Sequence, residues 1–325
     1  MGEIDMLRMF TAVLLIFCAT PAAAGESVSI DVEMEAQRVG PHSYYVQGRA
    51  GAATEHKGFI SNAGFVVTGK GVVVIDSLGS PALAQRLRQV IAGVTDEPVV
   101  KVIVTHYHAD HIYGLQVFES EGAEILAPRG AHDYLASEAA ERRLAERRRS
   151  LAPWVNEETR LVAPDRIVDG AESFTVGDVK FRLEYLGKAH SNGDLAVLVE
   201  PDLVLYSGDL IFEGRIPFVG DADTRRWLET LAELEHKGVA ALVPGHGPAA
   251  RDPGSAITLT RRYLQRLREV MGAAVEEMEE FSTAFESADW SEFRSLPAYE
   301  QAHRSNAYNV YLSMEAESMS DEQGM

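Results

Sequence analysis

The sequence predicts an α+β protein in which β-sheets are covered on the outside by helices. Apolar segments typical of strands recur along the chain, and stretches with helical spacing of apolar residues separate them. No internal repeat or low-complexity linker interrupts this order of strands, helices, strands and helices. The 325 residues are 46% hydrophobic and 24% charged, which excludes a wholly disordered or collagen-like chain.

The charge of the chain argues against two classes of partner. Asp and Glu number 49 against 30 Lys and Arg, which gives a formal net charge of -19. Such a surface repels phosphate backbones and anionic lipid headgroups. We therefore expect a small-molecule substrate, no nucleic acid and no stable membrane anchor, and the oligomeric state is left open.

The first 24 residues have the layout of a secretory signal peptide. The apolar run from Phe10 to Cys18 is too short to span a bilayer, which needs about 20 residues. Arg8 precedes it, and the small residues 22–24 provide a cleavage position after Ala24. An uncleaved anchor or a buried strand is the alternative. We expect export, to the periplasm, of a mature chain that begins at Gly25 and lacks cysteine, because Cys18 is the single cysteine.

The first half of the remaining chain reads as strands and helices in alternation. Residues Gly64 to Asp76 form two apolar strands around a Gly-Lys-Gly turn. A helix begins at Ser80-Pro81 and ends at Gly93, because serine caps a helix, proline suits its first turn and glycine suits its end. The apolar run Val99 to Thr105 predicts a strand covered on both faces. Residues Gly130 to Ser150 are expected to be helical, with a charged, exposed face.

The second half continues in the same way. A helix from about Asp223 to His236 and a long helix from Ser255 accompany four predicted strands, at Val179 to Leu186, Leu195 to Glu200, Leu203 to Tyr206 and Val239 to Val243. We expect residues 25–250 to form one domain. Residues 251–325 are expected to form a helical extension packed on that domain.

Histidine and aspartate residues follow several of these strands. The segment His106 to His111 (H-Y-H-A-D-H) comes directly after the predicted strand Val99 to Thr105 and holds three of the chain's 10 histidines. Three further strands end with a possible ligand, which are His190, Asp209 and His246, each with a glycine nearby. Imidazole and carboxylate are ligands that zinc takes in catalytic sites. The pattern therefore predicts a metal centre.

These motifs together resemble the metallo-β-lactamase-fold superfamily. The H-x-H-x-D-H segment, a spaced histidine, a Gly-Asp and a Gly-His-Gly occur in that order between about Asn62 and Gly247. The resemblance implies an αββα sandwich, with two facing mixed sheets, helices outside and metals along one edge. Asp76 matches an early aspartate that is structural in that family.

The resemblance also assigns ligands. It implies that His106, His108 and His190 hold one metal, that Asp110, His111 and His246 hold a second, and that Asp209 bridges both. An aspartate at position 209, where some lactamases have cysteine, is similar to the glyoxalase-II-type site. The cofactor implied is two Zn²⁺, with iron possible.

A narrower similarity concerns residues 208–223 and the stretch from Asn306 to Met314. These segments resemble exported zinc metallohydrolases associated with sulfur-oxidation and quinoprotein systems. Arg215 is a candidate to bind a substrate carboxylate or sulfonate, or else a structural arginine. Tyr308 and Asn309 are implied to line the pocket. The basic pattern that binds glutathione in glyoxalase II is not recognisable after Gly247.

We therefore expect a zinc-dependent hydrolase that uses a metal-bridging hydroxide on a small anionic or sulfur-linked ester or thioester-type substrate. Asp110 is the candidate catalytic residue, which orients the nucleophile and receives its proton. The alternatives are a mononuclear iron persulfide dioxygenase, a β-lactam or lactone hydrolase, and a non-catalytic metal-binding protein. Fold alone does not choose among them.

Overall fold

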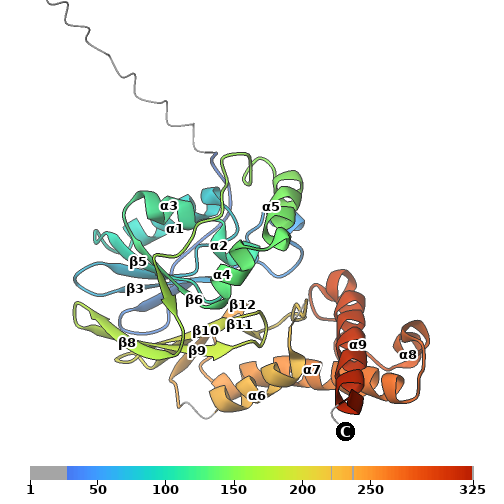
Figure 1. The fold of residues 1–325 in the computed structure, drawn as a ribbon. Coiled ribbons are helices and arrows are strands. Elements are labelled where there is room, and N and C mark those ends of the chain that lie inside the picture. The colour runs from blue at the N-terminus through green and yellow to red at the C-terminus, as the bar shows by residue number, and fades with distance from the viewer. Residues whose placement is uncertain (1–27, 221, 236–237, 324–325) are drawn as a thin grey trace, which may run out of the picture.

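A computed structural model describes residues 28–220, 222–235 and 238–323 of the chain. The predicted signal peptide, residues 1–24, and Cys18 lie outside these described residues. The structure has two β-sheets that face each other, with helices on both outer sides (Figure 1). The predicted α+β class and αββα sandwich are thereby confirmed.

The first sheet has seven strands in chain order and comes from the N-terminal half. Its first four strands pair antiparallel and its last four pair parallel, so the sheet is mixed. The strands are β1 (Gln37–Arg38), β2 (Ser43–Val46), β3 (Ala63–Val67), β4 (Val72–Ile75), β5 (Val99–Ile103), β6 (Glu124–Pro128) and β7 (Arg166–Val168).

The second sheet has five strands in the order β12-β11-β10-β9-β8 and is also mixed. Strands β8 to β11 are antiparallel neighbours, whereas β11 and β12 are parallel. The carboxyl ends of β11 and β12 therefore meet at one edge. The strands are β8 (Ala171–Val176), β9 (Val179–Gly187), β10 (Asp194–Val199), β11 (Val204–Phe212) and β12 (Ala241–His246).

Helices cover the outer face of each sheet, as Figure 1 shows. Helices α1 (Pro81–Ala92) and α3 (Leu115–Ser120) lie over the first sheet, and α6 (Thr224–Glu235) and α7 (Pro253–Glu276) lie over the second. One apolar layer lies between each sheet and its helices. A third apolar layer lies between the two sheets and includes Val73 and Ile103 from the first sheet and Phe181 and Val197 from the second. Burial of these three layers holds the two sheets in place.

The predicted helix from Ser80-Pro81 to Gly93 is confirmed. Ser80 caps α1 by accepting a hydrogen bond from the backbone N–H of Leu83 at 3.1 Å, and Gly93 is the C-terminal cap. The predicted helical character of residues Gly130 to Ser150 is confirmed, but two helices, α4 (Gly130–Leu135) and α5 (Glu138–Ser150), occupy this stretch. The side chain of Ser137 accepts from the N–H of Ala140 and starts a new helix there.

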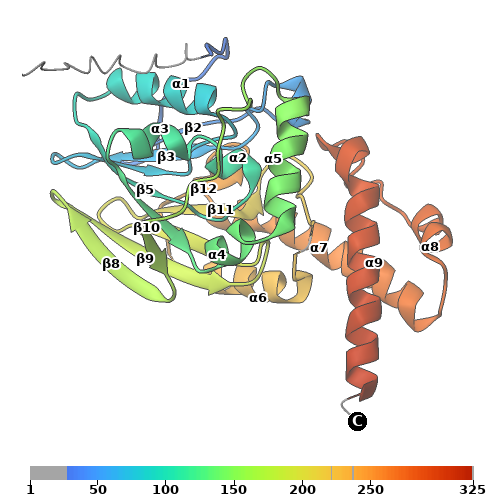
Figure 2. The same ribbon diagram turned by 45° about the horizontal axis from the view of Figure 1, so that its top comes forward.

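The C-terminal residues are helical. Helix α7 packs on the second sheet, whereas α8 (Phe281–Ser287) and α9 (Tyr299–Gln323) stand beside the sandwich (Figure 2). The short helices η1 (Ala53–Glu55) and α2 (Ala109–Ile112) complete the structure. Within the described residues, no helix combines the length and the apolar character needed to cross a membrane. The proposed division at residue 250 stays a prediction.

Candidate metal centre

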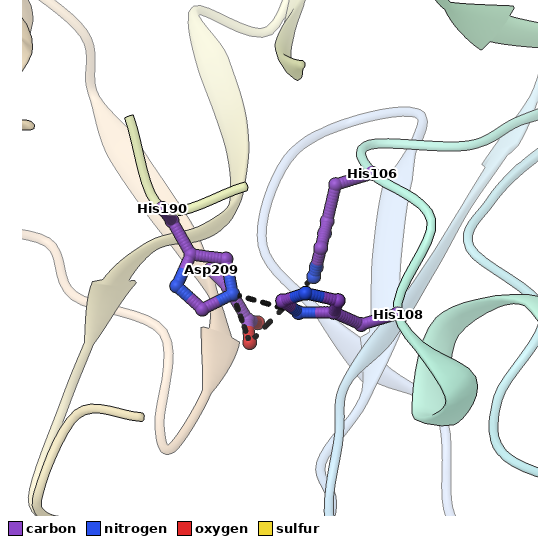
Figure 3. A group of neighbouring side chains, drawn as sticks. All are labelled: His106, His108, His190 and Asp209. Carbon is purple, nitrogen blue, oxygen red and sulfur yellow. Dashed lines mark hydrogen bonds and ion pairs between the residues drawn. The ribbon is translucent and has the colours of Figure 1, made fainter. Parts of the chain in front are cut away.

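All seven predicted metal ligands lie together where strands of the two sheets end. The segment His106 to His111 leaves β5 and enters the short helix α2, whose N-cap is His108. From the second sheet, His190 follows β9, Asp209 lies on β11 and His246 is the last residue of β12. Figure 3 shows His106 and His108 from one sheet pointing toward His190 and Asp209 from the other.

The ligands form two groups. The first contains His106, His108, His190 and Asp209, and within it one ligand atom from each residue lies within 4.8 Å of all the others. The second contains Asp110, His111 and His246, with the same limit. This division matches the one that the family resemblance implied.

Asp209 connects the two groups. One carboxylate oxygen, Oδ1, lies 3.1 Å from Nε2 of His111 in the second group. The other, Oδ2, lies 3.4 Å from Nε2 of His190 and 3.2 Å from Nε2 of His246. Asp209 thus reaches both groups, as a bridging ligand must.

Neighbouring groups fix which ring nitrogen of each histidine faces the centre. Oδ2 of Asp76 accepts from Nδ1 of His111 at 2.9 Å and from the Thr105 hydroxyl at 2.8 Å, so Nε2 of His111 is left for a ligand bond. Nδ1 of His246 donates to the carbonyl of Ile60 at 2.7 Å and likewise leaves Nε2 free. Asp76 therefore has the structural position that the resemblance implied.

Several buried atoms at the centre lack hydrogen-bond partners among the described residues. Nε2 of His106 is one of them, and two more are Nε2 of His111 and Oδ1 of Asp209, which form an ion pair with each other at 3.1 Å. Buried polar atoms are rarely left unpaired because desolvation costs about 1–3 kcal/mol for each group. A cation bound by these atoms would remove that cost, so the residues present fit a metal.

Burial keeps the first group of histidines neutral. It lowers the pKa of His106 well below its usual value, lowers that of His108, and lowers the pKa of His190 to about 3. Neutral imidazole is the form that binds a metal. These three rings are therefore ready to coordinate at neutral pH without losing a proton.

The second group has the opposite electrostatics. Burial acts to lower the pKa of His111 and of His246, but Asp209 and Asp110 outweigh it and raise both pKa values. Burial acts to raise the pKa of Asp209, and His246 and His111 outweigh it and hold that pKa well below the ordinary value. Protons on His111 and His246 thus offset the negative charge of the two carboxylates. A bound metal cation would take over that role.

Two glycines allow this close approach. A Cβ on Gly245 would overlap Oδ1 of Asp209, and a Cβ on Gly208 would lie 2.5 Å from the Thr105 hydroxyl. Gly208 also has a positive φ of 52°. The Gly-Asp and Gly-His-Gly motifs therefore leave the space that the ligands occupy.

Arg215 lies against the centre. Its guanidinium Nη1 is 3.3 Å from Nδ1 of His246, and the residue is 7% exposed. No carboxylate among the described residues forms an ion pair with it within 4 Å. Burial lowers the pKa of Arg215, which Asp209 and Asp110 oppose. This side chain is a nearly buried cation beside the predicted ligands.

The other two predicted substrate-binding residues lie on α9. Asn309 lines a groove of about 500 Å³ together with Lys188 and Gly220. Lys188 is two residues from His190 in the sequence, and Gly220 is two residues from Phe218. No metal ligand lines this groove. Tyr308 instead packs its ring against Phe281, with ring centroids 5.0 Å apart. Substrate binding by both residues stays a prediction.

Three residues near the centre had no role predicted from the sequence. They are Phe218, Thr105 and Ile60. The Phe218 ring lies 6.1 Å from the His108 ring and is 42% exposed. The sequence indicated Phe218 only as an apolar residue in the segment that follows Asp209. Thr105 and Ile60 act through contacts with Asp76 and His246, which no local pattern reveals.

Comparisons with known proteins agree with this geometry. The family model described as the metallo-beta-lactamase superfamily matches residues 56–246. A metallo-beta-lactamase type 2 from Elizabethkingia meningoseptica is 28% identical over 193 residues, which cover 58% of this chain and 69% of the relative.

Solved structures share the fold at lower identity. A metallo-beta-lactamase from Pontibacter korlensis has a TM-score of 0.56 and 19% identity, and the match covers 72% of this chain and 99% of that one. The stereoselective inverting sec-alkylsulfatase Pisa1 from Pseudomonas sp. has a TM-score of 0.68 and 19% identity, and the match covers 86% of this chain and 50% of that one. The sulfatase match thus extends over more of this chain.

Proposed function

Because the chain belongs to the metallo-beta-lactamase superfamily, we propose that it is a dinuclear zinc hydrolase for a small anionic ester or thioester-type substrate. The observation that carries the proposal is the pair of ligand groups joined by Asp209, in which Nε2 of His106, Nε2 of His111 and Oδ1 of Asp209 are buried without a hydrogen bond among the described residues. Membership of the superfamily supports a metallohydrolase, and the two ligand groups support two zinc ions.

The ligands divide as the geometry groups them. His106, His108 and His190 would hold one zinc, Asp110, His111 and His246 the other, and Asp209 both. Zinc in such a site supplies a Lewis acid and a water of lowered pKa. Aspartate at position 209 supports a glyoxalase-II-type ligand set, because the chain's single cysteine is Cys18, far from this motif in sequence.

Asp110 is suited to handle the proton. Its side chain is 23% exposed, whereas that of Asp209 is 4% exposed. Oδ2 of Asp110 lies 3.3 Å from Nε2 of His246, so both atoms face the same candidate metal position. Asp110 can thus accept a proton from an attacking water and release it to solvent, whereas Asp209 is enclosed.

The anionic class of substrate is supported by Arg215. A buried guanidinium that forms no ion pair with a described carboxylate retains donors for a carboxylate, sulfonate or sulfate group of a ligand. The structural likeness to an alkylsulfatase adds sulfate esters to the compounds worth testing. Association with sulfur-oxidation or quinoprotein systems stays a prediction.

We also propose that the protein is exported to the periplasm after removal of residues 1–24, acts on a small molecule, and binds neither nucleic acid nor a membrane. The sequence layout of residues 8–24 and the net charge of -19 support these proposals. Export would place the centre in a compartment where histidine and aspartate ligands resist oxidation better than cysteine.

Metal analysis tests the proposal directly. Protein purified without added metal should contain two zinc ions per chain and should hydrolyse one of a panel of chromogenic esters, with 4-nitrophenyl sulfate, 4-nitrophenyl acetate and an aromatic thioester as probes. One iron per chain with sulfide-dependent oxygen uptake would overturn it in favour of a persulfide dioxygenase. Hydrolysis of a chromogenic cephalosporin alone would favour a β-lactam hydrolase, and bound metal without turnover a binding protein.

His111→Ala separates a two-metal from a one-metal centre. The variant should retain one zinc and lose most of its hydrolytic activity, because the second group depends on His111. His132→Ala is the matched control, since His132 is exposed on α4. Full activity of His111→Ala with one metal would argue for a mononuclear enzyme.

A further inference from the structure

The loop that follows β11 connects the metal centre to the C-terminal helices. We infer that Asn306 of α9 is a positioning residue that holds residues 213–220 in place, so that Arg215 and Phe218 face the centre. The inference deepens the proposed function and rests on it for the role of Arg215. It assigns α9 a part in substrate recognition, although Asn306 lies outside the family match of residues 56–246.

The side-chain amide of Asn306 holds the loop by its backbone. Its Oδ1 accepts from the N–H of Val219 at 3.0 Å, and its Nδ2 donates to the carbonyl of Pro217 at 2.7 Å. One donor and one acceptor of the loop therefore set the orientation of the amide. Asn306 is 1% exposed, so these hydrogen bonds do not compete with bulk water.

Asn306 is itself held by neighbouring side chains. Its Nδ2 also donates to the hydroxyl of Tyr263 on α7 at 3.0 Å, and that hydroxyl lies 3.0 Å from Nδ1 of His303. A second contact ties the loop to the same region, because the N–H of Ile216 donates to the carbonyl of Pro297 at 3.1 Å. The loop is thus fixed at two points to the C-terminal helices and the segment before α9.

The opposite side of the loop touches the centre. Nη1 of Arg215 lies 3.3 Å from Nδ1 of His246, and the ring of Phe218 lies 6.1 Å from that of His108. The N–H of Glu213 donates to the carbonyl of His246 at 2.9 Å. A shift of the backbone at Pro217 or Val219 would therefore displace the two side chains that border the ligands.

The loop needs such support because it lacks regular structure of its own. Gly214 and Gly220 bound it with φ values of 66° and 48°, which permit the turns but leave the chain flexible. Pro217 has no N–H to donate. The bonds from Asn306 and from the Pro297 carbonyl therefore replace the strand hydrogen bonds that would otherwise order residues 216–219.

Amide hydrogen exchange tests the positioning role without relying on activity. In Asn306→Leu, exchange at the N–H of Val219 should rise by about tenfold or more relative to wild type, and trypsin should cleave after Arg215, because the loop loses both bonds. The zinc content should stay at the wild-type value. Ser305→Ala, at an exposed position on the same helix, should match wild type in every measurement.

The recognition role has its own readout. Inorganic sulfate is the probe, and calorimetric titration of zinc-loaded protein should show an affinity about tenfold weaker in Asn306→Leu than in wild type. Asn306→Asp keeps the acceptor for Val219 and loses the donor for Pro217, so it should protect the Val219 amide and restore part of the sulfate affinity. If Asn306→Leu does not fold, the same two measurements on Asn306→Asp test the positioning role.

The outcomes separate the two proposals. Unchanged exchange at Val219 in Asn306→Leu, or increased exchange with unchanged sulfate affinity, would overturn the positioning role. Failure of wild type to bind sulfate would instead overturn anion recognition by Arg215. Exchange and cleavage of the loop would still decide, in that case, whether Asn306 holds it.

Discussion

At the scale of single residues, the metal centre depends on side chains that bind no metal themselves. Asp76 directs His111 through its Nδ1 and also accepts from the backbone N–H of Thr105 at 2.8 Å. Asp76 has a φ of 61°, which few residues adopt apart from glycine, asparagine and aspartate. A supporting residue in so constrained a conformation has few possible replacements.

Asp76→Asn should weaken zinc binding by about 10- to 100-fold, because the amide cannot accept from Nδ1 of His111 and from Thr105 as a carboxylate does. Asparagine tolerates the left-handed backbone, so the fold should persist. Competition with a coloured zinc chelator measures the affinity. Asp178→Asn, at an exposed position between β8 and β9, is the control. Unchanged affinity in Asp76→Asn would contradict the supporting role.

At the scale of elements, α7 joins the extension to the sandwich and α9 completes the group of helices. Leu264 and Leu267 of α7 are fully buried and belong to the same apolar cluster as Leu210 and Phe212 of β11. His303 of α9 lies among aromatic rings, with its ring 4.4 Å from that of Tyr299 and 4.5 Å from that of Trp290. The extension is therefore packed through apolar and aromatic contacts.

Leu264→Ala should destabilise the protein by about 2–5 kcal/mol, because it leaves a cavity between α7 and the second sheet. Urea unfolding followed by circular dichroism and by tryptophan fluorescence measures the loss. Both probes should shift together if the extension and the sandwich unfold as one unit. Leu312→Ala, at an exposed position of α9, should have little effect. Two separate transitions would contradict a shared core.

His303 should make the stability depend on pH. Burial lowers its pKa to about 4 from an ordinary value of 6.5, so between these values the unfolded chain binds a proton that the folded chain excludes. Stability from this residue is therefore present above pH 6.5 and is lost as pH falls toward 4. His303→Gln should flatten the slope of unfolding free energy against pH in this window, and His132→Gln should not. Equal slopes in His303→Gln and wild type would contradict the assignment.

At the scale of the whole molecule, the centre lies where the two sheets meet, because each half of the sandwich contributes ligands to both groups. The first sheet supplies the segment His106 to His111, and the second supplies His190, Asp209 and His246. Without a bound metal, the carboxylates of Asp110 and Asp209 are balanced by protons on His111 and His246 and by the nearby Arg215 guanidinium. Bound metal should therefore hold the two halves of the sandwich together.

Removal of metal should lower the melting temperature. A ligand present at 1,000 times its Kd contributes about 4 kcal/mol to folding, and in a chain of about 300 residues each ~1 kcal/mol changes the melting temperature by roughly 1–2 °C. Calorimetry of protein before and after chelation measures the difference, and return of zinc should restore it. An unchanged melting temperature after metal loss would contradict a metal link between the sheets.

Much of the fold could be predicted from the sequence where signals are local. The α1 helix begins and ends at Ser80 and Gly93 because capping depends on adjacent residues. The break at Ser137 was missed, although its serine is a capping signal, because the charged face reads as continuous across it. Strands β1 and β7, with two and three residues, are too short for a periodic pattern.

By itself, the sequence predicted which residues are candidate metal ligands. His106 to His111 are consecutive, and His190, Asp209 and His246 each end or follow an apolar run, so their chemistry and spacing could be read along the chain. The tertiary structure decided what surrounds that set. Asn306 meets Val219 across 87 residues, and Arg215 reaches His246 across 31. Such contacts depend on how helices pack against sheets, and packing is set by the burial of many side chains at once rather than by any local pattern.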